Sequence, residues 1–181
     1  MIAIMYADLR EQLQSLPARR RRLRERQYLF HRGDPITALH RVKEGELRLV
    51  RHQPDGSELT LQRASPGQLF AEASVFATHY HCDAVAATPA EVDVIAISEV
   101  HRLLSANPDH ALAWARYLAH EVQRARFRAE LLSLKTVAER LDAWLAWHDA
   151  PLPPKGQWYR LARELGVRPE PLYREIARRR G

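Results

Sequence analysis

Cysteine is nearly absent from this 181-residue chain, in which Cys82 is the single thiol. One thiol cannot form an intrachain disulfide, which agrees with a reducing compartment. Long apolar runs are missing too, because no stretch approaches the roughly 20 residues of a membrane span and the opening MIAIM is too short for a signal-peptide core. We therefore expect a cytoplasmic globular protein without a membrane partner, whose core uses its 46% hydrophobic residues.

Catalytic signatures are also missing, since no GxSxG, P-loop or Ser-His-Asp arrangement is present. Only HYHCD at residues 79–83 gathers metal-ligand residue types. In a strand, alternate side chains share a face, which would set His79, His81 and Asp83 against Tyr80 and Cys82. A barrel metalloenzyme needs a further carboxylate and histidine, and Glu91 and His101 lie too far away. We predict no enzyme, no cofactor and no metal or haem site, with a cupin-like metalloenzyme as an alternative.

Lysine is scarce, because three lysines accompany 25 arginines, and the positive charge is unevenly spread. Residues 17–32 sum to +6 and residues 151–181 to +5, whereas residues 1–16 sum to −1 and residues 33–150 to −4. Basic flanks on an acidic body favour an anionic partner, most often nucleic acid. The alternative is an arginine-rich composition whose side chains are merely solvated.

Glycine is scarce but regularly placed, since four of the seven glycines recur 11 or 12 residues apart: Gly33, Gly45, Gly56 and Gly67. Between them, LHRVKE, ELRLVRH and ELTLQRA alternate apolar and polar residues as half-buried strands do. Residues 85–97 add more strand around a turn at Pro89 and Ala90. Such spacing indicates an antiparallel roll or barrel over residues 23–98.

The periodicity changes at Asn107, Pro108 and Asp109, which together form a helix start. Apolar residues then recur at spacings of 4 and 3, the a/d seam of a helix pair: Ala111, Ala115, Leu118, Val122, Ala125, Ala129 and Leu132. From Ala115 onward we predict that this seam is a homodimer interface; the alternative is packing on the β domain of the same chain. A second stripe on a rotated face would pack inside the chain's own domain: Phe127, Leu131, Leu134, Ala138, Leu141 and Leu145.

Residues 150–157, APLPPKGQ, are expected to be a linker, and residues 158–180 show two helical patterns broken at Gly166 and Val167. Ala162 permits a close helix crossing, and Gly166 permits the positive φ of a tight turn. Pro169 and Pro171 are tolerable in the first turn of the second helix. Five residues are expected to fill the small core: Leu161, Leu165, Val167, Leu172 and Ile176. This pattern predicts a helix-turn-helix, with a plain helical hairpin as the alternative.

The second of these helices exposes Glu170, Arg174 and Arg178 at four-residue intervals. Arg174 and Glu170 are expected to read base edges. The other predicted DNA contacts are Tyr173 and, mostly at phosphates, Arg168, Arg178, Arg179 and Arg180. Glu175 occupies a position that is often apolar in such units, and neighbouring Ile176 is expected to take over its packing.

The order of these pieces resembles the Crp/Fnr family of bacterial transcription regulators over about residues 23–181. The pieces are the glycine-spaced roll, the helix from NPD, then TVAERLDAWL and LARELGVRPEPLYREIA. The resemblance implies an α+β fold in three parts: an effector-sensing antiparallel β-roll (a double-stranded β-helix) with an N-terminal helical segment at 1–106, dimerisation helices at 107–149 and a helix-turn-helix domain at 150–181. It also implies a palindromic DNA operator, a homodimer, an unknown small-molecule effector and RNA polymerase as a candidate partner.

Residues 70–85, FAEASVFATHYHCDAV, match the family's phosphate-binding cassette but depart from it. Glu72 is kept for a ribose contact, whereas Tyr80 and His81 stand where cyclic-nucleotide binders have an arginine and a small residue. Loss of that cation would cost a charge-assisted bond of about 1.5–3 kcal/mol, so we predict no response to cyclic AMP. The remaining effector-pocket candidates are Ser74 and Arg126.

Two further departures bear on function. The sequence lacks the cysteine cluster of iron–sulfur members. Relatives usually continue past the position of Gly181 into a β-hairpin wing, so DNA affinity is expected to depend on the second helix and its arginines. The alternative is a dimeric ligand-sensing or interaction module that has lost DNA binding.

Overall fold

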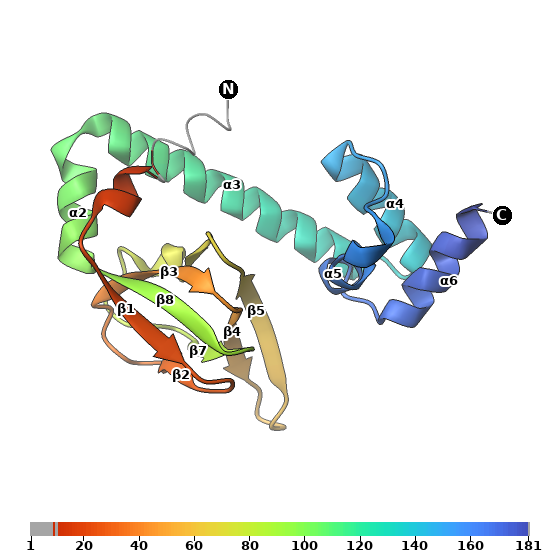
Figure 1. The fold of residues 1–181 in the computed structure, drawn as a ribbon, viewed down its shortest axis with the longest axis horizontal. Coiled ribbons are helices and arrows are strands. Elements are labelled where there is room, and N and C mark those ends of the chain that lie inside the picture. Colours follow the sequence, from red (N-terminus) through yellow and green to blue (C-terminus); the bar gives the residue numbers. More distant parts are fainter. Residues whose placement is uncertain (1–8, 10, 181) are drawn as a thin grey trace. The chain divides into compact units, whose positions relative to one another are not determined.

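The computed structural model describes residue 9 and residues 11–180 (Figure 1). The predictions on MIAIM and Gly181 lie outside the described residues. The chain divides into two compact units, Met1–Leu118 and Ala119–Gly181, which we describe separately. The division into three parts at 106 and 149 stays a prediction.

The first unit is built on two four-stranded antiparallel sheets (Figure 1). Their strands are β1 (Ala18–Leu23), β2 (Tyr28–Phe30), β3 (Ala38–Glu44), β4 (Leu47–His52), β5 (Glu58–Ala64), β6 (Leu69–Phe70), β7 (Asp83–Ala86) and β8 (Ala90–Ala96). One sheet has the order β1-β8-β3-β6 and the other β2-β7-β4-β5. The predicted antiparallel roll followed by helices is confirmed.

Tight turns set this topology, and the four regularly spaced glycines all have positive φ, between 75° and 88°. At Gly45 a Cβ atom would lie 2.1 Å from the carbonyl oxygen of Pro89, so a side chain would displace the neighbouring turn. The apolar faces of both sheets meet in one buried cluster, which includes Val42, Leu47 and Phe70. The spacing of the glycines therefore reflects the length of each strand and its turn.

Three details of the predicted roll are wrong. The first strand begins at Ala18, five residues before the predicted start of the roll, because the arginine run pairs with β8 as an edge strand. The turn before β8 occupies residues 87–89, and Ala90 already pairs in the strand. Residues 79–82 lie outside the named strands, with an isolated bridge from His79 to Pro35, and β7 starts at Asp83.

Helices cover the outer face of the β1-β8-β3-β6 sheet. Residues 11–15 are helical, a 3-10 turn spans Glu72–Ser74, and α2 runs from Ile97 to Ala106. Side chains of α2 and of the start of α3 pack on this sheet around Leu39, Ile95, Val100 and Trp114. No helix in the described part of the chain has the length and apolar character needed to cross a membrane.

The second unit contains the rest of α3 and three further helices (Figure 1). Their bounds are α3 (Pro108–Ser133), α4 (Val137–His148), α5 (Trp158–Glu164) and α6 (Pro169–Arg180), with a 3-10 turn at Lys155–Gln157. The predicted start of α3 is confirmed, because the side-chain oxygen of Asn107 accepts from the Asp109 amide at 2.9 Å. A buried cluster around Leu141, Leu161, Leu165 and Leu172 joins the four helices.

The break between α3 and α4 contains neither glycine nor proline. Thr136 is the N-cap of α4, and its hydroxyl accepts from the Glu139 amide at 3.1 Å. The Glu139 carboxylate in turn accepts from the Thr136 amide at 2.8 Å, which completes a capping box. These hydrogen bonds satisfy the first donors of α4 and so favour a new helix here over continuation of α3.

Candidate nucleic-acid interface and sensor roll

The predicted helix-turn-helix is present, with α5 and α6 joined by residues 165–168. Gly166 has a φ of 64°, and the Val167 amide donates to the Ala162 carbonyl at 2.9 Å. Ala162 is fully buried where the helices cross. The predicted core residues Leu161, Leu165, Leu172 and Ile176 are buried, and Val167 is half-buried.

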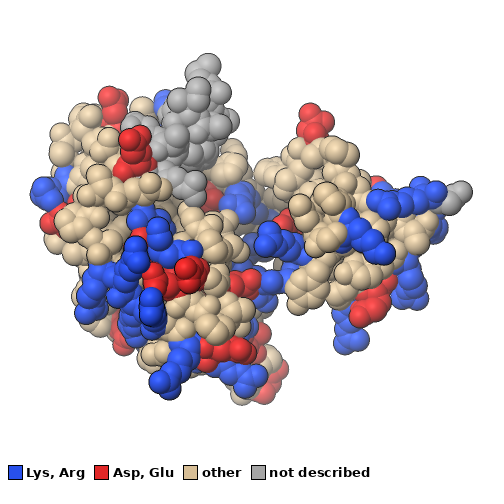
Figure 2. Space-filling view, in the orientation of Figure 1, with Lys and Arg blue, Asp and Glu red and all other residues tan. Residues whose placement is uncertain are grey.

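The reading face predicted on α6 lies opposite its buried side. Leu172 and Ile176 face the core, whereas the predicted DNA contacts are exposed: Arg168, Glu170, Tyr173, Arg174, Arg178 and Arg179. Arg174 makes no hydrogen bond or ion pair with any described residue. Figure 2 shows basic side chains on the surface of the C-terminal unit, and a second group over the roll.

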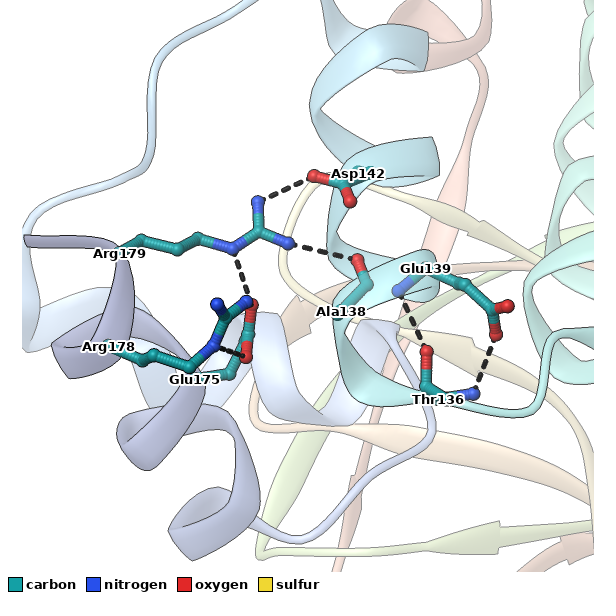
Figure 3. Close-up of polar contacts among 7 residues, drawn as sticks. All are labelled: Thr136, Ala138, Glu139, Asp142, Glu175, Arg178 and Arg179. Atoms are coloured by element: carbon teal, nitrogen blue, oxygen red, sulfur yellow. Dashed lines mark hydrogen bonds and ion pairs between the residues drawn. The ribbon is translucent and has the colours of Figure 1, made fainter.

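Glu175 organises two of these arginines (Figure 3). Its carboxylate accepts from Arg178 at 2.8 and 3.0 Å and from Arg179 at 2.6 Å. Arg179 also donates to Asp142 at 2.5 Å and to the Ala138 carbonyl at 3.2 Å. The hydrogen bonds from Arg178 and Arg179 lower the pKa of Glu175 to about 2. Glu175 therefore holds Arg178 and Arg179 in place, and Ile176 supplies the apolar packing as predicted.

A shallow, open depression of about 340 Å³ lies beside this network, and it is lined by Thr136, Val137, Ala138, Pro171, Arg174, Glu175 and Arg178. It joins the N-terminus of α4, where the helix dipole is positive, to the basic face of α6. Arginine side chains beside the positive end of a helix dipole favour an anion, whereas the Glu175 carboxylate in the same lining disfavours one. The sequence analysis did not place the start of α4 beside α6, although T-x-x-E at 136–139 is a readable helix-start signature.

The predicted dimer seam is largely exposed on α3. Val122 and Leu132 have 48% and 54% of their surface exposed, and Ala115, Ala125 and Ala129 are exposed as well. Leu118 is half-buried and contacts the core of the first unit. The second stripe packs inside the C-terminal unit as predicted, with Phe127, Leu131 and Leu141 buried.

Aromatic side chains fill the interior of the roll around Tyr80. The Tyr80 ring stacks on Phe30 with centroids 3.5 Å apart, and its hydroxyl donates to the Ala38 carbonyl at 3.1 Å. Phe30 also contacts the rings of Phe70 and His40. Burial raises the pKa of Tyr80 to about 12. Tyr80 is thus a packing element of the roll interior.

The other pocket candidates differ in burial and belong to different units. Glu72 and Ser74 are buried, and the Glu72 carboxylate accepts from the Gln62 amide group at 2.8 Å. Gln62, which sequence reasoning missed, also accepts from the amide of Ala71 at 3.3 Å. His81 is exposed, and Arg126 belongs to the other unit.

The histidine-rich segment keeps the predicted alternation although residues 79–82 are not a strand. His79 and His81 are exposed, whereas Tyr80 and Cys82 are buried. Burial raises the pKa of the Cys82 thiol. Within residues 9 and 11–180, no group of three His, Cys, Asp or Glu side chains could hold a metal ion.

Comparison with known proteins gives consistent matches. Residues 20–107 match the family model described as a cyclic nucleotide-binding domain. The chain is 30% identical over 122 residues to the transcriptional regulator LdrP of Thermus thermophilus, and 31% identical over 114 residues to the cyclic AMP receptor protein of that organism. The solved structure of FixK2 from Bradyrhizobium japonicum shares the fold, with a TM-score of 0.68 and 20% identity over 90% of this chain and 84% of that one.

The chain therefore combines a β-roll that matches the cyclic nucleotide-binding domain model with a helical unit that contains a helix-turn-helix. It is similar to transcriptional regulators of the Crp/Fnr type. Since its relatives are transcriptional regulators, the prediction of a non-enzymatic protein is confirmed. The matches take in 63% of this chain and 63% of LdrP, and 62% of this chain and 53% of the cyclic AMP receptor protein. Activities and partners of those whole proteins are therefore proposals for this chain.

Proposed function

We propose that this chain is a homodimeric, sequence-specific DNA-binding regulator that does not respond to cyclic AMP. The proposal depends on the two-sided character of α6. Its apolar side is buried, whereas Glu170 and Arg174 are exposed and take no part in the packing of the core. An unpartnered arginine on an exposed helix face suits bidentate recognition of guanine.

Dimerisation is supported by the exposed seam on α3. Val122 and Leu132 are about half exposed and lie at coiled-coil spacing with exposed alanines between them. A second copy of the chain would bury this seam. The two reader helices would then meet half-sites about one helical turn, roughly 34–36 Å, apart on a palindromic operator.

The lack of a cyclic AMP response is supported by the roll interior. Tyr80 is 5% exposed and its one hydroxyl is used by the Ala38 carbonyl, so it offers no cation to a cyclic phosphate. A phosphate buried without a charge-assisted partner would bind poorly. The roll would instead take an effector of another class, or serve as a rigid support.

The test is selection of duplexes from a random pool by the purified protein, followed by fluorescence anisotropy with the winning sequence. Arg174→Ala is expected to weaken binding by about 1–3 kcal/mol and to relax preference at one base pair. Arg124→Ala is the matched control, because Arg124 is an exposed arginine on α3 paired with Glu121. Addition of cyclic AMP is expected to leave the isotherm unchanged.

Failure to enrich any sequence would favour a dimeric sensing or interaction module without DNA binding. Equal losses for Arg174→Ala on all duplexes would assign this residue to phosphates instead of bases. A tighter isotherm with cyclic AMP would overturn the proposal for the roll.

A further inference from the structure

Arg140, in the first part of α4, donates hydrogen bonds to four backbone carbonyls. Its Nε donates to the Leu134 carbonyl at 3.0 Å, and its Nη2 donates to the Leu132 carbonyl at 3.3 Å. Its Nη1 donates to the carbonyls of Leu165 and Gly166 at 3.0 and 3.2 Å. The first pair lies at the C-terminal end of α3, and the second pair lies in the turn between α5 and α6.

These acceptors are groups that helices leave unpaired. The last carbonyls of a helix have no intrahelical donor, and they lie at the negative end of its dipole. A guanidinium carries five donors in a fixed plane, so one arginine can bridge several such carbonyls, whereas a lysine ammonium is a compact point charge. Arg140 therefore caps the ends of α3 and α5 with a single side chain.

Packing brings the same two segments together. A Cβ atom at Gly166 would lie 2.7 Å from the Leu132 Cδ2 atom and 3.5 Å from an Arg140 nitrogen. Leu132 also belongs to the seam on α3, where more than half of its surface is exposed. The turn of the helix-turn-helix is thus in contact with the end of the predicted dimer helix, and Arg140 links them through hydrogen bonds.

We infer that Arg140 is a positioning residue that fixes the direction of the reader helix α6 relative to the seam on α3. The inference rests on the proposed function, because only a dimer that reads two half-sites needs this direction fixed. Loss of the guanidinium would leave the reading face of α6 intact, and would let α5 and α6 turn about the end of α3. The two reader helices would then tolerate several half-site spacings.

Half-site spacing is the direct readout. The probes are the palindromic duplex selected by the wild-type protein, the same duplex with two base pairs added or removed at its centre, and a duplex with one half-site. Each net hydrogen bond favours its arrangement by about 2- to 13-fold, so Arg140→Gln is expected to shrink the penalty for altered spacing by on the order of tenfold. Binding to the single half-site is expected to stay near wild type.

The spacing penalty of Arg140→Lys should fall between those of wild type and Arg140→Gln, because lysine keeps the charge but cannot span four carbonyls. If circular dichroism shows that Arg140→Gln is unfolded, the spacing penalty of Arg140→Lys tests the inference instead. Arg124→Gln should keep the full spacing penalty. An unchanged spacing penalty in both Arg140 variants would overturn the inference, as would an equal loss on the single half-site, which would indicate general destabilisation. If the wild-type protein selects no duplex, the proposed function itself fails.

Discussion

His40 gives a stability test of the filled roll. Its side chain is 6% exposed beside Phe30, and its Nδ1 atom has no hydrogen-bond partner among the described residues. Burial first, and the charge of Arg21 second, lower the pKa of His40 to about 4 from 6.5. The folded protein therefore keeps His40 neutral at pH values where the unfolded chain binds a proton.

The sign and size follow from this difference. Above pH 6.5 both states are neutral, so the stability is fully present, and it falls as the pH drops from 6.5 toward 4. With these two pKa values, His40 alone should remove about 2 kcal/mol from the free energy of unfolding between pH 7.5 and pH 5. A water-filled roll would solvate the imidazolium and remove most of this loss.

The assay is urea unfolding at pH 7.5 and pH 5, followed by circular dichroism. His40→Leu should lose about 2 kcal/mol less than wild type over this interval, because leucine binds no proton. His79→Gln is the matched control, since His79 is exposed, and it should keep the wild-type dependence. Identical pH dependence in wild type and His40→Leu would refute the reasoning, as would titration of the His40 ring near pH 6.5 by nuclear magnetic resonance.

Two further predictions concern the helical unit. Val122→Glu places a charge in the exposed seam, so it should yield monomers in sedimentation velocity while circular dichroism stays unchanged; a persisting dimer would move the interface elsewhere. Glu175→Gln removes the negative charge that Arg178 and Arg179 share. Both arginines would then be available to phosphates, so DNA affinity should rise and its salt dependence should steepen. Weaker binding would show that Glu175 is needed to orient the arginines.

The sequence predicted the turns of the fold, because glycines mark them. The glycines at 11- or 12-residue spacing marked turns because each has positive φ, and Gly166 marked the helix-turn-helix for the same reason. The strand β1 was not predicted, because its consecutive arginines show no alternation of apolar and polar residues. Pairing with β8 makes these residues a strand. Edge strands are often charged in this way, which limits unwanted pairing.

The candidate site was less predictable because long-range contacts decide it. Exposure of Arg174 follows from helical spacing, but the hold of Glu175 on Arg179 also involves Asp142 on another helix. The four acceptors of Arg140 are backbone carbonyls. Every residue has such a carbonyl, so the residue types in the sequence do not reveal these contacts. That Tyr80 stands where the family has an arginine stays a prediction, whereas its stacking on Phe30 is seen only in the structure.

The most direct measurement of the central claim is the composition of the protein–DNA complex by native mass spectrometry. The proposed function predicts two chains on one palindromic duplex chosen by the protein, and a smaller fraction of that complex with Arg174→Ala at the same concentration and salt. A complex with one chain per duplex, or one that forms equally well with any sequence, would contradict it.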